Sequence, residues 1–334
     1  MLVITGATGH IGNVLARQLV SQGEKVRVLA LPGETLVPIE DIDVDIVYGD
    51  VTKPDTLRKA FQGAETVYHL AGIIRIAPGQ KDLLYKVNVE GVKNVIAACH
   101  ACQVKRLVYT SSVHAFVEPP KGEAINENTP IDPEKVKGDY AKSKAIATLE
   151  LLKATRENEV EVIIVAPSGV IGPCDFFVSE MGQVILDYIN KKLKAYIDGA
   201  YDFVDVRDVV TGIIAAATRG KPGEIYMLSG ELIRVSQILK HLQKITNIKA
   251  PQYRMPGWVA IAVSPFSNLY YWILRQRPLF TKYSVQVLFS NANIDNSKAR
   301  RELSFDPRPW QESITDACHW FENNSAILAK INKK

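Results

Sequence analysis

The sequence predicts an α/β protein, built as a doubly wound parallel sheet followed by a smaller and mostly helical C-terminal lobe. Short apolar runs alternate with helical patterns over roughly the first two-thirds of the 334 residues, the rhythm of strands joined by crossover helices. A glycine-rich turn separates the first apolar run from the first helical pattern. Beyond residue 170 the alternation gives way to helical patterns.

The apolar runs are short and nearly continuous, as in strands that are buried on both faces of a parallel sheet. They predict strands at 2–5, 26–31, 45–48, 66–70, 106–111 and 162–166. The helical patterns between them lie near 11–22, 54–62, 82–102 and 140–157. Connections between parallel strands are right-handed crossovers, so we expect a sheet with helices on both faces.

The later part of the chain predicts the smaller lobe. Helices are expected near 179–194, 208–219, 235–246 and 309–324, with short strands near 195–198 and 225–228. Asp208 is expected to cap the helix that it begins, with closure of a ligand site as an alternative role. We assign residues 1–170, plus returning segments near 200–230, to the sheet domain, and residues 171–199 and 231–325 to the lobe.

Composition excludes several classes of protein. The 40 basic and 36 acidic residues leave a net charge of only +4, so nucleic acid is not an expected partner. The four cysteines form no disulfide framework, and Cys99 and Cys102 are expected to be structural residues of a helix. No metal site is predicted. The first strand begins at Leu2, so we expect no signal peptide and a cytoplasmic location.

One apolar and aromatic segment stands out in the lobe. Residues 258–274 are apolar except for interruptions such as Ser264 and Asn268, and arginines flank them. A membrane span needs about 20 consecutive apolar residues, so we expect a packed helix pair here. The alternative is a partly exposed apolar lid at 256–281 that contacts a hydrophobic substrate or the surface of a membrane.

The glycine-rich turn predicts a dinucleotide site of the Rossmann type. Gly6, Gly9 and Gly12 let the backbone approach a pyrophosphate, and the following helix directs its N-terminal amides toward the phosphates. Asp50, at the end of the third strand, can accept a hydrogen bond from adenine. The end of the second strand, at 30–33, has neither a carboxylate for the ribose nor a cation for a 2′-phosphate, so NAD and NADP both stay open.

A second constellation predicts chemistry at a carbonyl group. Tyr140 and Lys144 are one helical turn apart and share a helix face, and Ser112 ends an upstream apolar run. The tyrosine hydroxyl can act as acid or base, and the lysine cation would lower its pKa toward neutrality. The serine hydroxyl would donate to the substrate oxygen as charge develops there. Nicotinamide-dependent hydride transfer is the reaction that fits both the dinucleotide site and this constellation.

These motifs together resemble the short-chain dehydrogenase/reductase superfamily in its extended branch, over nearly the whole length. The matching segments are Thr5-Gly6-Ala7-Thr8-Gly9-His10-Ile11-Gly12, His69-Leu70-Ala71-Gly72, Val87-Asn88-Val89-Glu90-Gly91, Tyr109-Thr110-Ser111-Ser112, Tyr140 with Lys144, and Phe203-Val204-Asp205-Val206-Arg207-Asp208. The resemblance implies Ser112, Tyr140 and Lys144 as the catalytic triad. It also implies a homodimer formed by the helices near 88–102 and 140–157.

The same resemblance implies which residues contact NAD or NADP. They are Gly6, Thr8, Gly9, His10, Ile11, Gly12, Asp50, Val51, Leu70, Ala71, Gly72, Asn88, Thr110, Tyr140, Lys144, Pro167, Ser168 and Val170. Most of them follow the ends of predicted strands, where the ligands of open parallel sheets bind.

Departures from the nucleotide-sugar members favour a hydrophobic substrate. Val113 and His114 follow Ser112 where dehydratases carry an acidic pair, Gly169 replaces a usual asparagine, and Tyr201 replaces a usual arginine. The chain looks closer to dihydroflavonol 4-reductases and 3β-hydroxysteroid dehydrogenases. The candidate substrate residues are His114, Phe176, Phe177 and Tyr201. The expected function is an NAD(P)(H)-dependent oxidoreductase that interconverts a carbonyl and an alcohol on a hydrophobic small molecule.

Two alternatives use the same fold. A nucleotide-sugar 4-epimerase would employ the triad of Ser112, Tyr140 and Lys144 for a transient oxidation. A non-catalytic dinucleotide-sensing protein would bind the cofactor alone, although such proteins typically lose the Tyr-Lys pair that this chain keeps.

Overall fold

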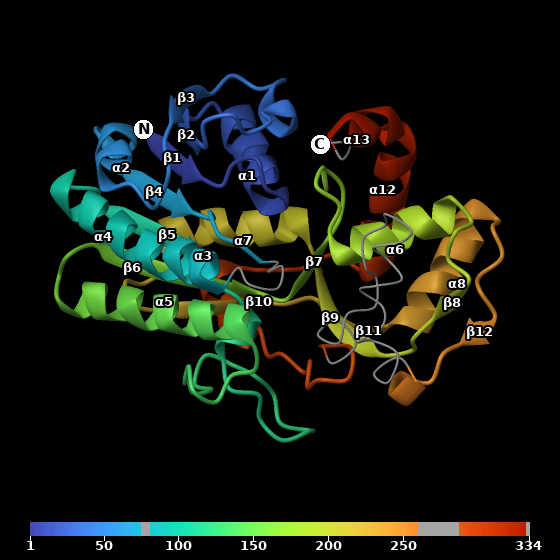
Figure 1. Ribbon diagram of the computed structural model, residues 1–334. Coiled ribbons are helices and arrows are strands. Elements are labelled where there is room, and N and C mark those ends of the chain that lie inside the picture. The colour runs from blue at the N-terminus through green and yellow to red at the C-terminus, as the bar shows by residue number, and fades with distance from the viewer. Residues whose placement is uncertain (75–80, 260–286, 332–334) are drawn as a thin grey trace.

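The computed structural model describes residues 1–74, 81–259 and 287–331, and it contains a seven-stranded sheet in the order β10-β6-β5-β4-β1-β2-β3 (Figure 1). Every neighbouring pair in this sheet is parallel. Its strands are β1 (Leu2–Thr5), β2 (Val26–Ala30), β3 (Asp45–Tyr48), β4 (Thr66–His69), β5 (Arg106–Thr110), β6 (Glu161–Pro167) and β10 (Ile225–Leu228). The predicted doubly wound sheet is confirmed.

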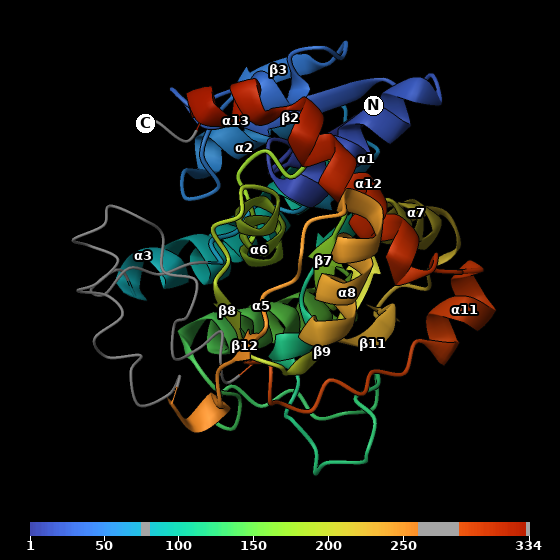
Figure 2. The same cartoon turned by 90° about the vertical axis from the view of Figure 1, so that its right-hand side faces the viewer.

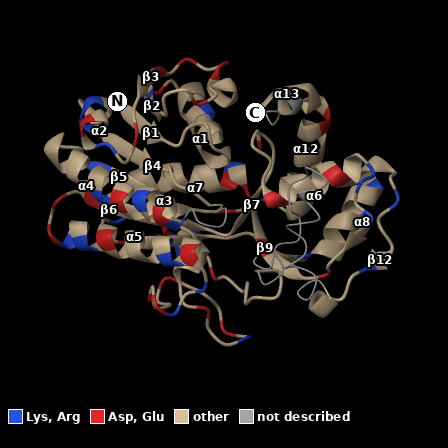
Figure 3. Cartoon of the chain, viewed as in Figure 1, with Lys and Arg blue, Asp and Glu red and all other residues tan. Residues whose placement is uncertain are grey.

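Helices cover both faces of the sheet because successive strand residues point to opposite sides. One face packs against α2 (Pro54–Phe61), α4 (Gly91–Ala101) and α5 (Asp139–Arg156). The other face packs against α1 (His10–Ser21), α7 (Val206–Arg219) and α11 (Ser297–Leu303). In β5, for example, Leu107 belongs to the first apolar cluster and Val108 to the second. Lys, Arg, Asp and Glu residues occur along the helices, as the blue and red parts of the ribbon in Figure 3 show.

The helix expected near 82–102 is confirmed in its span, but it contains a π-helical turn that was not predicted. The structure has α3 (Lys81–Tyr85), a π-helical turn η2 (Lys86–Glu90) and then α4. Within the π-turn, the Asn88 side chain accepts from the Ile73 amide at 2.8 Å and donates to the Ile73 carbonyl oxygen at 2.9 Å. This pairing with a distant backbone segment accompanies the widened turn, and sequence periodicity cannot register it.

The lobe is less helical than expected. It contains a three-stranded sheet of β7 (Gly169–Ile171), β9 (Ala200–Asp205) and β11 (Glu231–Arg234), and a two-stranded sheet of β8 (Ala195–Tyr196) and β12 (Tyr253–Arg254). Its helices are α6 (Glu180–Ile189), α8 (Val235–Thr246), α12 (Trp310–Asn323) and α13 (Ser325–Ile331), shown from a second side in Figure 2. They share a third apolar cluster with β9 and β11.

Two helix boundaries differ from expectation for local reasons. The helix expected over 179–194 ends at Ile189 because Lys191 adopts a φ of +59°, and the amides of Lys192 and Leu193 turn back to the Asp187 carbonyl oxygen. The helix expected at Asp208 begins instead at Val206.

The expected cap at Asp208 is therefore wrong. Asp205 is the N-cap of α7, and its carboxylate accepts from the Arg207 amide at 2.8 Å. Asp208 lies in the first turn of the helix, where its carboxylate pairs with Arg308 at 2.9 Å. An aspartate one turn earlier thus satisfies the free helix amides.

The aromatic segment predicted near 256–281 lies mostly outside the described residues. Trp258 is described and is 74% exposed. Within the described ranges, none of the helices has both the length and the apolar character needed to cross a membrane. The division of the chain into two domains stays a prediction.

Candidate active site

The backbone of the glycine turn after β1 packs so closely that Gly6 and Gly12 have no room for a side chain, and we call this turn the cradle. Gly6 has a φ of +75°, and a Cβ atom there would lie 2.7 Å from the Ala71 amide nitrogen. A Cβ at Gly12 would lie 2.0 Å from the Gly6 carbonyl oxygen. The N-cap of α1 is Gly9, which supplies no side chain to the first helix amides. The cradle therefore fits the pyrophosphate of a dinucleotide, whose charge those amides and the helix dipole would stabilise.

Two polar residues hold this turn against the loop that follows β7. His10 Nε2 lies 2.9 Å from the Pro173 carbonyl oxygen. The fully buried Asn13 donates to the carbonyl oxygens of Gly9 at 2.8 Å and Cys174 at 3.1 Å. Asn13 was not predicted from the sequence, although an asparagine on the apolar face of a helix is a signal that could have indicated it.

The other predicted cofactor residues follow the carboxyl ends of the strands. Asp50 follows β3, and its Oδ1 accepts from the Thr52 amide at 2.8 Å. Thr110 ends β5, and its Oγ1 is buried with no hydrogen-bond partner among the described residues. The remaining members lie at the same ends of the strands: Thr8 in the turn after β1, Ile11 in the first turn of α1, Val51 after β3, Leu70, Ala71 and Gly72 after β4, Pro167 at the end of β6, Ser168 directly after it, and Val170 in β7.

The predicted triad is brought together where β5 meets α5. Ser112 follows β5 and Tyr140 lies in the first turn of α5, and their side chains are hydrogen-bonded. Burial raises the pKa of Tyr140 to about 12, and the Ser112 hydrogen bond acts in the opposite direction. The Tyr140 hydroxyl is therefore protonated at neutral pH.

Lys144 is buried one turn further along α5. Its ammonium donates to the Thr110 carbonyl oxygen at 2.8 Å and to the Tyr109 hydroxyl at 3.1 Å. Burial lowers the pKa of Lys144 to about 7. The sequence predicted that this cation would lower the pKa of Tyr140, and for the enzyme with a bound dinucleotide this stays a prediction. The ammonium is engaged by β5 and only partly charged near neutrality, so burial dominates the pKa of Tyr140.

A layer of polar residues fixes the position of α5 behind the triad. Asn88 donates to the Ser143 hydroxyl at 3.0 Å, and that hydroxyl donates to the Tyr140 carbonyl oxygen at 2.8 Å. The Thr148 hydroxyl bonds to the Ser111 hydroxyl at 2.7 Å and donates to the Lys144 carbonyl oxygen at 2.8 Å. Asn88 thus reaches the helix backbone through Ser143, and the direct cofactor contact predicted for it stays a prediction.

Buried aromatic residues lie on the inner side of Lys144. Its ammonium is 4.7 Å from the centre of the Tyr109 ring, a cation–π distance. His69 is fully buried 5.6 Å from the same ring, and its Nδ1 pairs with the Thr5 hydroxyl at 2.7 Å. Burial and the charge of Lys144 lower the pKa of His69 to about 3, so the imidazole is neutral.

Of the four candidate substrate residues, His114 and Tyr201 lie together, Phe176 packs within the lobe, and Phe177 is 39% exposed. His114 Nε2 lies 3.0 Å from the Tyr201 hydroxyl, and the His114 ring centre is 6.4 Å from that of Tyr140. Burial lowers the pKa of His114 to about 4, so this pair is uncharged near neutrality. Phe176 is instead buried against Trp320 of α12 with ring centres 5.0 Å apart, a position in the packing of the lobe.

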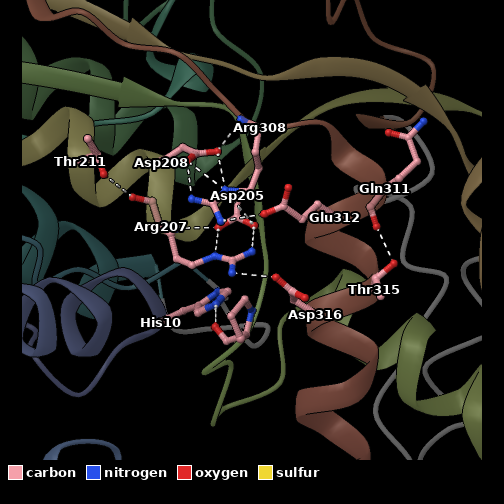
Figure 4. A network of polar contacts seen from close by, with 11 residues as sticks. His10, Asp205, Arg207, Asp208, Thr211, Arg308, Gln311, Glu312, Thr315 and Asp316 are labelled. Atoms are coloured by element: carbon pink, nitrogen blue, oxygen red, sulfur yellow. Dashed lines mark hydrogen bonds and ion pairs between the residues drawn. The ribbon is translucent and has the colours of Figure 1, made fainter.

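A network of ion pairs joins α7 to α12 and to the segment before it (Figure 4). Arg207 pairs with Asp205 and with Asp316 of α12, both at 2.7 Å. Arg308 pairs with Asp208 at 2.9 Å and lies 3.8 Å from Asp205. The Asp205 side chain is fully buried, so both of its cationic neighbours stabilise its charge. The network fixes α12 beside the start of α7.

Asp202 is a buried carboxyl group of β9 that the sequence did not predict as notable. It accepts from the Gly230 amide at 2.9 Å and interacts with the Ser168 hydroxyl, yet burial raises its pKa from 3.8 to about 6. The unfolded chain ionises near pH 4 and the folded chain near pH 6. The free energy of unfolding therefore falls as the pH rises through this window and stays lower above it.

The variant Asp202→Asn keeps an acceptor for Gly230 and removes the buried charge. We expect it to raise the free energy of unfolding at pH 8 by up to about 3 kcal/mol, with the gain vanishing below about pH 4. Urea unfolding at pH 4 and pH 8 measures this. Asp306→Asn, at a side chain that is 88% exposed, is the control. A variant no more stable than the wild type at pH 8 would contradict the prediction.

Comparisons with known proteins agree with this geometry. A model of the NAD dependent epimerase/dehydratase family matches residues 2–229. Sterol demethylase protein B of Methylococcus capsulatus is 33% identical over 97% of this chain and 99% of its own length. A putative dihydroflavonol 4-reductase of Synechocystis sp. is 31% identical over 97% of this chain and 95% of its own.

Solved structures share the fold over nearly the whole chain. The crystal structure of gox2253 has a TM-score of 0.84 and 31% identity, and covers 97% of this chain and 98% of that one. A nucleoside-diphosphate-sugar epimerase from Pseudomonas aeruginosa has a TM-score of 0.79 at 21% identity, with 97% of each chain covered. The chain therefore belongs to the NAD dependent epimerase/dehydratase family and is an NAD(P)-dependent enzyme of the extended short-chain dehydrogenase/reductase type.

Proposed function

We propose that the enzyme interconverts a carbonyl and an alcohol on a hydrophobic small molecule. The observation that carries the proposal is the protonated Tyr140 hydroxyl, hydrogen-bonded to Ser112 and one helical turn from Lys144. A tyrosine with a pKa of about 12 holds its proton at neutral pH, which suits the donor in a carbonyl reduction. When bound, the nicotinamide supplies or accepts the hydride.

Each triad residue has a separate task in this proposal. Tyr140 donates its proton to the substrate oxygen as that oxygen gains negative charge. Ser112 donates a second hydrogen bond to the same oxygen, which lowers the energy of the transition state. Lys144, whose ammonium reaches the Thr110 carbonyl at the end of β5, anchors the cofactor ribose and supplies positive charge near Tyr140.

The wall beside Tyr140 supports a hydrophobic substrate. The neutral His114–Tyr201 pair occupies the place where an acidic pair and an arginine are usual in nucleotide-sugar enzymes. A diphosphate would gain no cation from this pair. The relatives over 30% identical are named for a sterol demethylase and a dihydroflavonol reductase, and a 3β-hydroxysteroid dehydrogenase/decarboxylase of Arabidopsis thaliana is 29% identical. A polycyclic ketone or alcohol is the substrate class that these observations favour.

The proposal is tested in two stages. First, NAD and NADP are titrated against the purified protein by thermal shift, and we expect at least one to raise the melting temperature. Second, hydrophobic aldehydes, ketones and sterols are assayed with the reduced cofactor at 340 nm. UDP-glucose is incubated with the oxidised cofactor in a separate assay and the epimerised sugar is separated by chromatography, because an epimerase returns its hydride and leaves no net change at 340 nm. Turnover of a hydrophobic carbonyl supports the proposal. Turnover of UDP-glucose alone would replace it with an epimerase, and binding of neither dinucleotide would reject both.

A further inference from the structure

The carboxylate of Glu34 contacts the glycine turn, although the end of the second strand at 30–33 contains no acidic residue. β2 ends at Ala30, and the next four residues form a tight turn in which the Glu34 amide donates to the Leu31 carbonyl oxygen at 3.1 Å. Pro32 and Gly33 take its two central positions, and Gly33 has a φ of +81°, as a type II turn requires. The turn returns Glu34 toward the end of the strand.

The Glu34 side chain bridges the turn after β2 and the turn after β1. Its Oε2 accepts from the Leu31 amide at 2.9 Å, and its Oε1 accepts from the Thr8 hydroxyl. Thr8 lies between Gly6 and Gly9 in the dinucleotide cradle. A carboxylate offers about four lone-pair directions, so two are left to accept further hydrogen bonds.

In Rossmann folds the adenosine ribose binds beside the glycine turn and the end of the second strand. In Rossmann sites an acidic residue about 20 residues beyond the glycine turn accepts from the ribose 2′-hydroxyl. Glu34 lies 22 residues after Gly12 in the sequence. The strand end itself, Ala30-Leu31, is apolar, and the carboxylate comes instead from the turn beyond it. Neither the residues at the end of the strand nor the glycine motif indicates that Glu34 returns to this position.

The charge around Glu34 opposes a 2′-phosphate. Residues 28–52 contain no lysine or arginine and six acidic residues: Glu34, Glu40, Asp41, Asp43, Asp45 and Asp50. Arg17, on the neighbouring helix α1, donates to both Asp41 carboxylate oxygens at 2.6 Å and to the Pro38 carbonyl oxygen at 2.7 Å. Its guanidinium is therefore already committed to protein acceptors.

We propose that Glu34 makes this enzyme select NAD over NADP, by accepting hydrogen bonds from the ribose 2′-hydroxyl and repelling a 2′-phosphate. The inference rests on the dinucleotide site of the proposed function. A phosphate dianion beside a carboxylate costs several kcal/mol where solvent screening is incomplete, so we expect NAD to bind the wild type about tenfold tighter than NADP, or more.

The test measures binding, without any substrate. NAD and NADP are titrated by isothermal calorimetry into the wild type, Glu34→Gln and the double variant Leu31→Arg/Glu34→Gln. Glutamine keeps the shape and loses the charge, so we expect the NAD-to-NADP affinity ratio to fall at least about fivefold. The arginine, at a position that is 49% exposed in the wild type, should move the preference toward NADP. Glu40→Gln, an exposed acid of the same segment, is the control and should keep the wild-type ratio.

The outcomes separate this inference from the proposed function. A wild type that binds NADP as tightly as NAD overturns the role of Glu34 and leaves the oxidoreductase intact. So does a folded Glu34→Gln variant, verified by circular dichroism, with an unchanged ratio. Binding of neither dinucleotide to the wild type rejects the proposed function itself. If the glutamine variant does not fold, the wild-type ratio still decides the question.

Discussion

Replacement of Tyr140 by phenylalanine is expected to remove carbonyl reduction while leaving the binding of the dinucleotide nearly unchanged. The variant deletes one oxygen atom, and with it the only proton donor that the proposed mechanism directs at the substrate. A positioned general acid contributes about 10²–10⁴-fold in rate, so we expect kcat to fall by about that factor. The ring itself stays, so the packing at the start of α5 is preserved.

The measurement combines steady-state kinetics with dinucleotide titration. Tyr253→Phe deletes the same atom from a side chain that is 63% exposed, and it should turn over like the wild type. Ser112→Ala is expected to lower kcat by a smaller factor, because Tyr140 could still protonate the substrate oxygen. Full turnover by Tyr140→Phe on a verified substrate would show that another group supplies the proton.

The parallel sheet could be predicted because each of its strands is marked by a short apolar run in the sequence. The runs at β1 and β3 were predicted to the residue. β1 is apolar over its whole length because it is buried between helices. β3 is the largely exposed edge strand, and its signal is the β-branched and aromatic run Ile46-Val47-Tyr48. β9 carried no such signal. It reads Ala-Tyr-Asp-Phe-Val-Asp, and two charged residues within six argue against a buried strand. Both carboxyl groups have partners distant in sequence: the Gly230 amide for Asp202 and Arg308 for Asp205, which also pairs with Arg207 two residues later.

In the candidate site, too, residues with a local sequence pattern were predicted, and residues whose role depends on distant contacts were not. The glycine turn was predicted because its spacing within one strand-turn-helix unit reflects its geometry. Ser112 and Tyr140 were predicted because one follows an apolar strand and the other lies in the first turn of the next α-helix. Glu34 was missed because its role depends on a turn that folds it back onto Thr8, 26 residues earlier in the chain. Likewise, the partners of Lys144 lie on β5, 34 and 35 residues before it, so its pKa could not be derived from its own helix.

The second large effect is expected at Gly12, where an added methyl group should disrupt the cofactor cradle. In an ordinary helix, Gly→Ala is stabilising by about 1 kcal/mol. Here the new Cβ would lie 2.0 Å from the Gly6 carbonyl oxygen and 2.8 Å from the Ala7 Cα, and both are backbone atoms that no rotamer change can move. Helix α1 must therefore shift away from β1.

We expect Gly12→Ala to lower the free energy of unfolding by about 1–3 kcal/mol, because overpacking against backbone outweighs the gain in helix propensity. The stabilisation of the protein by NAD should be lost as well, since displacement of α1 moves the amides that would bind the pyrophosphate. Thermal shift with and without NAD measures both effects. Ser21→Ala removes a hydroxyl at the exposed end of the same helix, adds no atom near the cradle, and should leave the NAD shift intact. If Gly12→Ala kept both its melting temperature and its response to NAD, the close contact between α1 and the turn after β1 would not be what forms the cofactor site.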